Sequence, residues 1–204
     1  MRVSTPSLRA QFRHQVRERA LQVAQSLTVE RGWAQVRVNE VAALTGVSRP
    51  TLYAEFGDKY GLGEALVLRE TDAFLSGIAE VLRHHHDDAQ GAVTEAVRYA
   101  LEQAEASPLL RAILTSTRGV DQDLLPLLTT DAAPIFRAAS ETLVAWFSLH
   151  FPQFPDGDVE AAVDALVRLT VSHIVMPAQE SPDQTAARLA SLALRFIEPR
   201  GVEA

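Results

Sequence analysis

One short stretch constrains the fold more than any other, because it interrupts an Ala/Leu/Val-rich chain with glycine and proline. It runs from Thr45 to Leu62 and reads TGVSRPTLYAEFGDKYGL. Gly46 can end one helix, and Ser48 can cap the next, because its hydroxyl accepts a bond from an unpaired backbone N–H. Pro50 falls in the first turn, where its missing N–H costs nothing, and Gly57 closes the helix. The stretch therefore predicts two short helices joined by a tight turn.

The second short helix, RPTLYAEF, is predicted to have two unlike faces. Leu52 and Phe56 are four residues apart and should pack inward. Arg49, Thr51 and Tyr53 then project from the other side. This is the geometry of a helix-turn-helix, whose second helix enters the major groove of DNA. The residue spacing alone does not distinguish a helix-turn-helix from an ordinary antiparallel helix pair with a charged surface.

The segment before this stretch is predicted to be a long helix over residues 7–31, which Gly32 ends as a left-handed cap. Apolar residues spaced three and four apart mark its buried face. These are Phe12, Val16, Ala20, Val23 and Leu27. On another face, arginine repeats every four residues, at Arg9, Arg13 and Arg17.

A short helix, VNEVAALT, lies between the long helix and the turn. Its spacing predicts one buried face, formed by Val38, Val41, Ala42 and Leu44. Val47 is apolar within the turn and should pack between the two short helices.

Charge is divided unevenly along the chain. Residues 1–60 hold nine Arg and Lys and five Asp and Glu, a net of +4, and residues 61–204 hold ten and twenty-one, a net of −11. The total of −7 argues against a general nucleic-acid binder, but the division fits a basic recognition module on an acidic body. Asp58 can cap the helix that follows. Lys59 in its first turn opposes the helix dipole, which is more easily understood if a phosphate is its partner.

Residues 17–62 resemble the DNA-binding region of the tetracycline-repressor (TetR) family of bacterial transcription regulators. The matching segments are RERALQVAQSLTVERGW and VNEVAALTGVSRPTLYAEFGDKYGL. They hold A-x-x-x-G-V-S-R, T-L-Y-x-x-F and a following lysine in the family's order and spacing.

The resemblance implies which residues would face DNA. Arg49 is expected to reach bases, and Thr51 and Tyr53 to lie at the DNA surface. Phosphate contacts are expected from four residues: Arg37, Ser48, Lys59 and Tyr60. Pro50 is also expected at the DNA-binding surface, where it replaces a residue that is more often small or polar in the family, so one potential groove contact is lost. Arg37 and Tyr60 also depart from the family's usual residues, so the operator sequence stays open.

The rest of the chain reads as further helices, so the protein is predicted to be all-α with nine or ten helices. The resemblance implies a three-helix DNA-binding head with a helix-turn-helix over residues 1–57. It also implies a helical bundle over residues 58–204 that binds an effector and dimerises.

The last two predicted helices carry wide apolar stripes. In the family, the equivalent hairpin forms a four-helix dimer interface, so a homodimer on a palindromic double-stranded DNA operator is expected. The residues expected at this interface are Leu166, Leu169, His173, Leu189, Leu192 and Phe196.

The body is rich in Ala, Leu and Val, which favours a small, largely apolar effector of unknown identity. The residues expected to line its pocket are Phe74, Ile78, Tyr99, Gln103, Ile113, Phe136 and Trp146. No cofactor is expected.

Other function classes find less support. The sequence has no Cys and none of the motifs G-x-S-x-G, H-E-x-x-H, P-loop or G-x-G-x-x-G, so no enzyme is expected. It has no apolar run long enough for a membrane span and no signal-peptide core at its N-terminus, so a cytoplasmic protein is expected.

Two alternatives stay open. One is a constitutive DNA-binding regulator without an effector. The other is a metal-binding helical protein that uses the stretch HHHDD, His84–Asp88. Glu80, His84 and Asp88 would share one helix face if the helix persisted that far, but the stretch more simply ends a helix, so no metal is expected.

Overall fold

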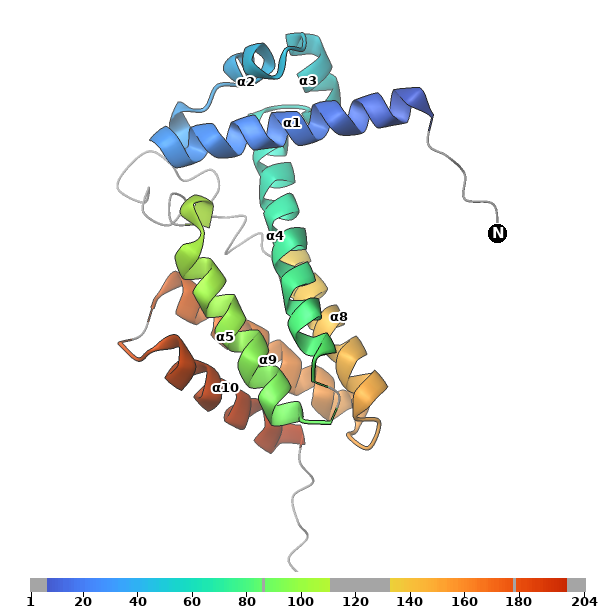
Figure 1. Ribbon diagram of the computed structural model, residues 1–204, viewed down its shortest axis with the longest axis vertical. Coiled ribbons are helices and arrows are strands. Elements are labelled where there is room, and N and C mark those ends of the chain that lie inside the picture. The colour runs from blue at the N-terminus through green and yellow to red at the C-terminus, as the bar shows by residue number, and fades with distance from the viewer. Residues whose placement is uncertain (1–6, 86, 111–132, 178, 198–204) are drawn as a thin grey trace, which may run out of the picture. The chain divides into compact units, whose positions relative to one another are not determined.

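The computed structural model describes residues 7–85, 87–110, 133–177 and 179–197, and these confirm the all-helical fold class with its N-terminal helix-turn-helix. Figure 1 shows their arrangement. Within these ranges the elements are α1 (Leu8–Arg31), the short 3-10 helix η1 (Trp33–Gln35), α2 (Val38–Thr45), α3 (Arg49–Phe56), α4 (Lys59–Arg83), α5 (Ala89–Ala106), α8 (Ala133–His150), α9 (Asp156–Val175) and α10 (Pro182–Ile197).

The described residues form two compact units. We call the residues up to Arg69, with residues 108–110, the head, and the remaining described residues, from Glu70 onward, the body. The division between the units falls inside α4, which runs without interruption from Lys59 to Arg83. The division expected at residue 57 instead separates the helix-turn-helix from the start of α4.

The helix α1 crosses the head beneath α2 and α3 (Figure 1). Ser7 caps it by accepting a bond from the Ala10 N–H, and Gly32 ends it with a positive φ. The predicted buried face is confirmed at three positions: Val16, Ala20 and Leu27. Phe12 was wrongly placed on that face. Its side chain is 60% exposed, because it lies in the first turns of α1, which no other described element covers.

The turn between α2 and α3 forms as the glycine and serine predict. Gly46 adopts a left-handed conformation at the end of α2, and its N–H donates to the Ala42 and Ala43 carbonyls. Leu44 was wrongly predicted to be buried and is 53% exposed. Thr45 takes the inward position instead, because its hydroxyl donates to the Val41 carbonyl at 2.6 Å and can therefore be buried without loss.

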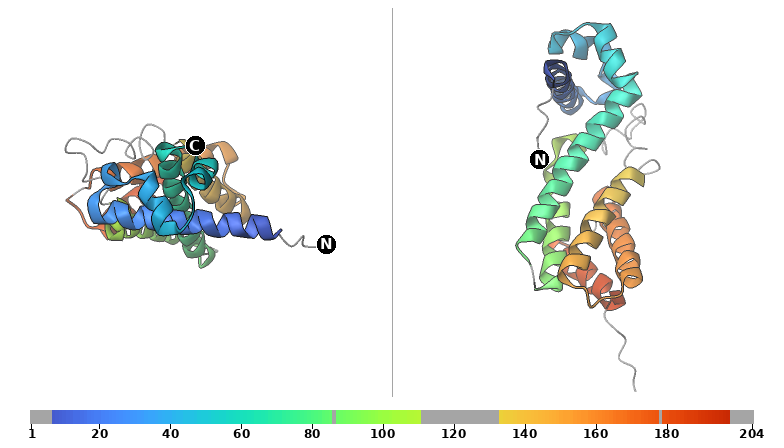
Figure 2. Two further views of the ribbon diagram at one scale, coloured as in Figure 1. Left: turned by 90° about the horizontal axis from the view of Figure 1, so that it is seen from above. Right: turned by 90° about the vertical axis from the view of Figure 1, so that its right-hand side faces the viewer.

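The body packs α5 against α10 and α9, and α8 lies beside α9 (Figure 2). Its core is aliphatic, with an aromatic cluster at the end of α8 formed by Trp146, Phe147 and Phe151. The Trp146 indole donates to the Leu82 carbonyl at 3.0 Å, which ties α8 to the end of α4. Gly77 lets α5 approach α4 closely, because a Cβ there would lie 1.9 Å from the Tyr99 hydroxyl.

None of the helices within the described ranges is long and apolar enough to cross a membrane.

Candidate functional site: a nucleic-acid interface and an apolar pocket

The helix α3 presents a polar outer face that its own cap holds in place. The Ser48 hydroxyl accepts from the Thr51 N–H at 3.3 Å and lies 2.8 Å from the Thr51 hydroxyl. The side chains on this face are exposed, as the sequence predicts, and comprise Arg49, Pro50, Thr51 and Tyr53. Together they offer a guanidinium, hydroxyls and an aromatic ring, groups that can bond to base edges and phosphates.

The opposite face of α3 is anchored to the rest of the head. Leu52 is fully buried. Arg17 of α1 donates to the Glu55 carboxylate at 3.0 Å, and its guanidinium lies 5.2 Å from the centre of the Phe56 ring. Arg13 reaches the same carboxylate at 3.4 Å. These contacts fix the direction in which the outer face of α3 points.

The start of α4 lies at the edge of this surface. Asp58 accepts from the Gly61 N–H at 2.8 Å, which is the cap that the sequence predicts. Lys59 turns back onto the head, where its ammonium donates to the Ala34 carbonyl at 3.2 Å and lies 5.2 Å from the centre of the Trp33 ring. An ammonium has three donors, so the bond to Ala34 leaves capacity for a phosphate.

Arg37 and Tyr60 are both exposed. Arg37 occupies the N-cap position of α2, where its backbone carbonyl accepts from the Glu40 and Val41 N–H groups and its side chain makes no capping bond. A neighbouring ion pair joins Glu40 to Arg31 at 2.5 Å, and the hydrogen bond that the Arg31 guanidinium donates to the Glu40 carboxylate raises the pKa of Arg31. The pair holds the start of α2 against the end of α1.

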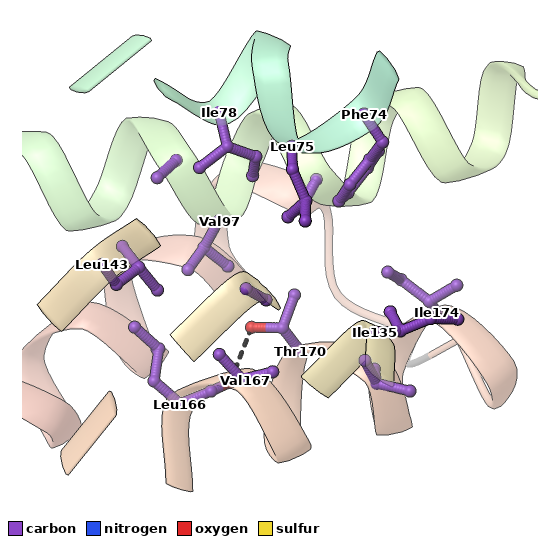
Figure 3. Close-up of a pocket in the computed structure, with 14 residues that line it drawn as sticks. Phe74, Leu75, Ile78, Val97, Ile135, Leu143, Leu166, Val167, Thr170 and Ile174 are labelled. Atoms are coloured by element: carbon purple, nitrogen blue, oxygen red, sulfur yellow. Dashed lines mark hydrogen bonds between the residues drawn. The ribbon is translucent and has the colours of Figure 1, made fainter. Parts of the chain in front are cut away.

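The body contains an apolar pocket of about 80 Å³ between α4, α5, α8 and α9 (Figure 3). Phe74, Leu75 and Ile78 line it from α4, and Val97 lines it from α5. The polar group on its wall is the Thr170 hydroxyl, which donates to the Leu166 carbonyl at 2.8 Å. The described lining therefore offers a ligand dispersion contacts and apolar surface, with that hydroxyl already bonded within α9.

Two of the residues predicted for the pocket, Phe74 and Ile78, line it. The other predicted residues lie elsewhere or outside the described ranges. Tyr99 packs against Phe74, with ring centres 6.1 Å apart, and Trp146 is part of the core. Phe136 lies beneath the Arg168 guanidinium at 5.3 Å. Gln103 is exposed on α5, so it faces water, and Ile113 lies outside the described residues.

Comparison with known proteins decides the family. A family model described as bacterial regulatory proteins, tetR family, matches residues 20–66, and one described as the bacterial tetracyclin repressor C-terminal domain matches residues 88–195. The HTH-type transcriptional regulator AlkX of Mycobacterium tuberculosis is 33% identical over 187 residues, 92% of this chain and 87% of the relative. The chain belongs to the TetR family of transcriptional regulators. It is therefore a DNA-binding regulator and not an enzyme.

Solved TetR structures agree with this fold. One is the TetR family repressor AlkX from Dietzia sp. strain DQ12-45-1b, implicated in the biodegradation of n-alkanes. It shares 29% identity and a TM-score of 0.69, with 90% of this chain and 94% of that chain covered. RolR in complex with resorcinol has a TM-score of 0.60 at 22% identity, covering 93% of this chain and 90% of that chain. At that identity, the likeness to RolR is evidence for the fold only, and not for a shared ligand.

The residues predicted for a TetR dimer interface separate into two groups. Leu166 and Leu189 are 4% and 3% exposed, because they pack in the core of their own protomer. These two side chains therefore offer little exposed surface to a second protomer. The exposed members are Leu169, Leu192 and Phe196, at 37%, 46% and 63%, and His173 is half-buried. The exposed Met176, at the end of α9, was not predicted.

The groups considered for a metal site have other partners. Asp88 caps α5 by accepting from the Gly91 N–H at 2.8 Å. Glu80 pairs with Arg83, and His84 bonds through Nδ1 to the Glu80 carbonyl at 2.9 Å. Across the described residues, no cluster of three His, Cys, Asp or Glu side chains is placed to hold a metal ion.

Sequence reasoning missed most of the pocket wall and the contacts of Glu55. The repeat at Arg9, Arg13 and Arg17 was visible, but its carboxylate partner lies 38 residues from Arg17 along the chain. The unpredicted pocket residues come from α4, α5, α8 and α9, and include Leu75, Val97, Ile135, Leu143, Val167 and Ile174. Apolar residues at helical spacing indicate a buried face, and a buried face is equally consistent with a filled core and with a pocket wall.

We expect Lys59→Ala to weaken binding to every DNA sequence alike, because a phosphate contact carries no base information. The slope of log affinity against log salt should become shallower by about one unit per protomer. Fluorescence anisotropy titrations over a range of salt concentrations measure both effects. Arg188→Ala on α10 removes the same charge from the body and serves as the control. If Lys59→Ala leaves both the DNA affinity and the salt slope unchanged, the lysine contacts no phosphate, and its role is limited to its contacts with Ala34 and Trp33.

Proposed function

We propose that this TetR-family protein is a repressor that binds a palindromic operator as a homodimer and is released by a small, largely apolar molecule. The observation that carries the effector part is the apolar pocket between α4, α5, α8 and α9. The described wall of that pocket is hydrocarbon apart from the Thr170 hydroxyl, so it favours a ligand that binds by burying apolar surface.

The continuity of α4 supports coupling between pocket and DNA. Its first turn holds Lys59 at the DNA-facing head, and its later turns place Phe74 and Ile78 in the pocket wall. A ligand acts only through different affinities for the DNA-competent and incompetent states. A continuous helix that belongs to both regions is a physical element through which such a difference can act.

The chemistry of a relative suggests the first probes. The Dietzia AlkX structure is described as a repressor implicated in n-alkane biodegradation. Straight-chain alkanes and alkyl alcohols match the hydrocarbon lining, and simple aromatic compounds serve as a comparison class.

The homodimer rests on exposed apolar residues of the last two helices. Leu192 and Phe196 are four residues apart on α10, and Leu169 is exposed on α9. Leaving such residues in water is unfavourable, and a stable dimer would bury about 1,200–2,000 Å² in total. Two-fold symmetry in the protein then requires two half-sites in the operator, about 34 Å apart.

We expect Leu192→Asp to convert the dimer to a monomer at micromolar concentration, because a carboxylate would be buried without a partner at the interface. Sedimentation velocity measures the change. Leu149→Asp is the matched control, because Leu149 is a 75% exposed leucine on α8. If Leu192→Asp and the control sediment alike as dimers, the α9–α10 interface is wrong.

We expect an aliphatic probe to raise the melting temperature of the wild-type protein and to weaken its DNA binding by about 5–150-fold. Ala139→Leu adds volume to a half-buried position in the pocket wall and should abolish both effects while the DNA affinity stays unchanged. Differential scanning fluorimetry and anisotropy measure the two. Ala145→Leu, at an exposed position of the same helix, is the control.

The absence of any response to small molecules would favour a regulator without an effector. If no compound from a broad aliphatic and aromatic panel shifts either the melting temperature or the DNA affinity, the constitutive account becomes the better one.

A further inference from the structure

The first two turns of α1 make an unusual exposed segment of the head. Every residue from Ser7 to Gln15 is exposed, although the segment is helical from Leu8 onward. Figures 1 and 2 show these turns continuing toward the N-terminus past α3. Eight helical residues extend about 12 Å, so this part of α1 lengthens the head without adding to its core.

This segment carries a regular stripe of positive charge. Arg9, Arg13 and Arg17 are spaced four residues apart and so share one face of α1. The three side chains have different surroundings. Arg17 is held by Glu55 and the Phe56 ring, whereas the Arg13 side chain is 78% exposed and meets the same carboxylate at the longer distance of 3.4 Å. Arg9 is exposed one turn earlier, about 6 Å further along the helix.

The stripe faces the side of the head that bears the recognition helix, because both Arg13 and Arg17 reach Glu55 on α3. Glu55 is also the acidic residue of RPTLYAEF, so it would repel phosphates if it were unpaired. One carboxylate against two guanidinium groups leaves net positive charge beside α3. Arg9 extends this charge one turn further along α1 toward its N-terminus.

We propose that the first two turns of α1 are a second DNA-contacting element, in which Arg9 and Arg13 bind backbone phosphates flanking the bases that α3 faces. The proposal rests on the operator binding described above, and it is independent of the effector. Charge complementarity carries it, since phosphates are the partner that an exposed arginine stripe next to a recognition helix fits. Arg17 has a different role and is a positioning residue that holds α3.

The test compares the double variant Arg9→Ala/Arg13→Ala with the wild-type full-length protein on two DNA duplexes. The duplexes come from a genomic fragment recovered by pull-down with the wild-type protein. One is the shortest duplex that still contains both half-sites, and the other extends it by about one helical turn on each side. The control is the double variant Arg19→Ala/Arg188→Ala, which removes the same amount of positive charge from two other exposed positions. Arg19 points about 200° away from Arg17 around α1.

On the long duplex, the variant should bind more weakly than the wild-type protein, with a salt slope shallower by about two units per protomer. On the short duplex, the two proteins should bind alike, and hydroxyl-radical footprints should lose protection only in the flanks. If the variant matches the control on both duplexes, or loses affinity equally on both, the proposal is overturned while operator binding itself stands. Circular dichroism of the variant verifies that α1 remains folded.

Discussion

An eight-residue helix is not stable alone in water, and the proposed DNA-facing surface of this protein is built on one. The head supplies what α3 lacks. The Leu52 side chain of α3 is fully buried in the head, and Ser48 caps the first turn of α3. Arg17 of α1 contacts Glu55 and Phe56 in the last turn of α3. The orientation of Arg49, Thr51 and Tyr53 therefore depends on α1, and so does any reading of DNA by those side chains.

Local signals made the head predictable, because its elements are delimited by residues whose conformational preferences act over a few positions. Gly46 and Gly57 adopt positive φ, and Ser48 caps α3, as the sequence indicates. Burial was less predictable, because it depends on which neighbour covers a face. Phe12 repeats at the spacing of a core residue yet is exposed on the first turns of α1. Leu166 and Leu189 face their own core, while Leu192 and Phe196 face outward. The Arg17–Glu55 pair joins residues 38 positions apart, a separation at which no local pattern carries information.

The pocket and the recognition surface have opposite chemical characters. The outer face of α3 offers charge and hydrogen-bonding groups, whereas the body offers an aliphatic pocket whose Thr170 hydroxyl is already bonded to its own helix. A ligand that enters this pocket gains free energy by burying apolar surface, at roughly 25 cal/mol per Å². The coupling free energy of about 1–3 kcal/mol that the proposed release of DNA requires is a modest fraction of such a binding free energy.

The central claim is that one molecule in the pocket and one operator on the head compete through the same helix. Thermodynamic linkage gives this claim a direct measurement. The operator affinity is titrated with and without a saturating aliphatic ligand, and the ligand affinity is titrated with and without saturating operator. The account predicts that both affinities fall by the same factor. If each partner binds with the same affinity whether or not the other is present, pocket and DNA surface are not coupled, and the account is contradicted.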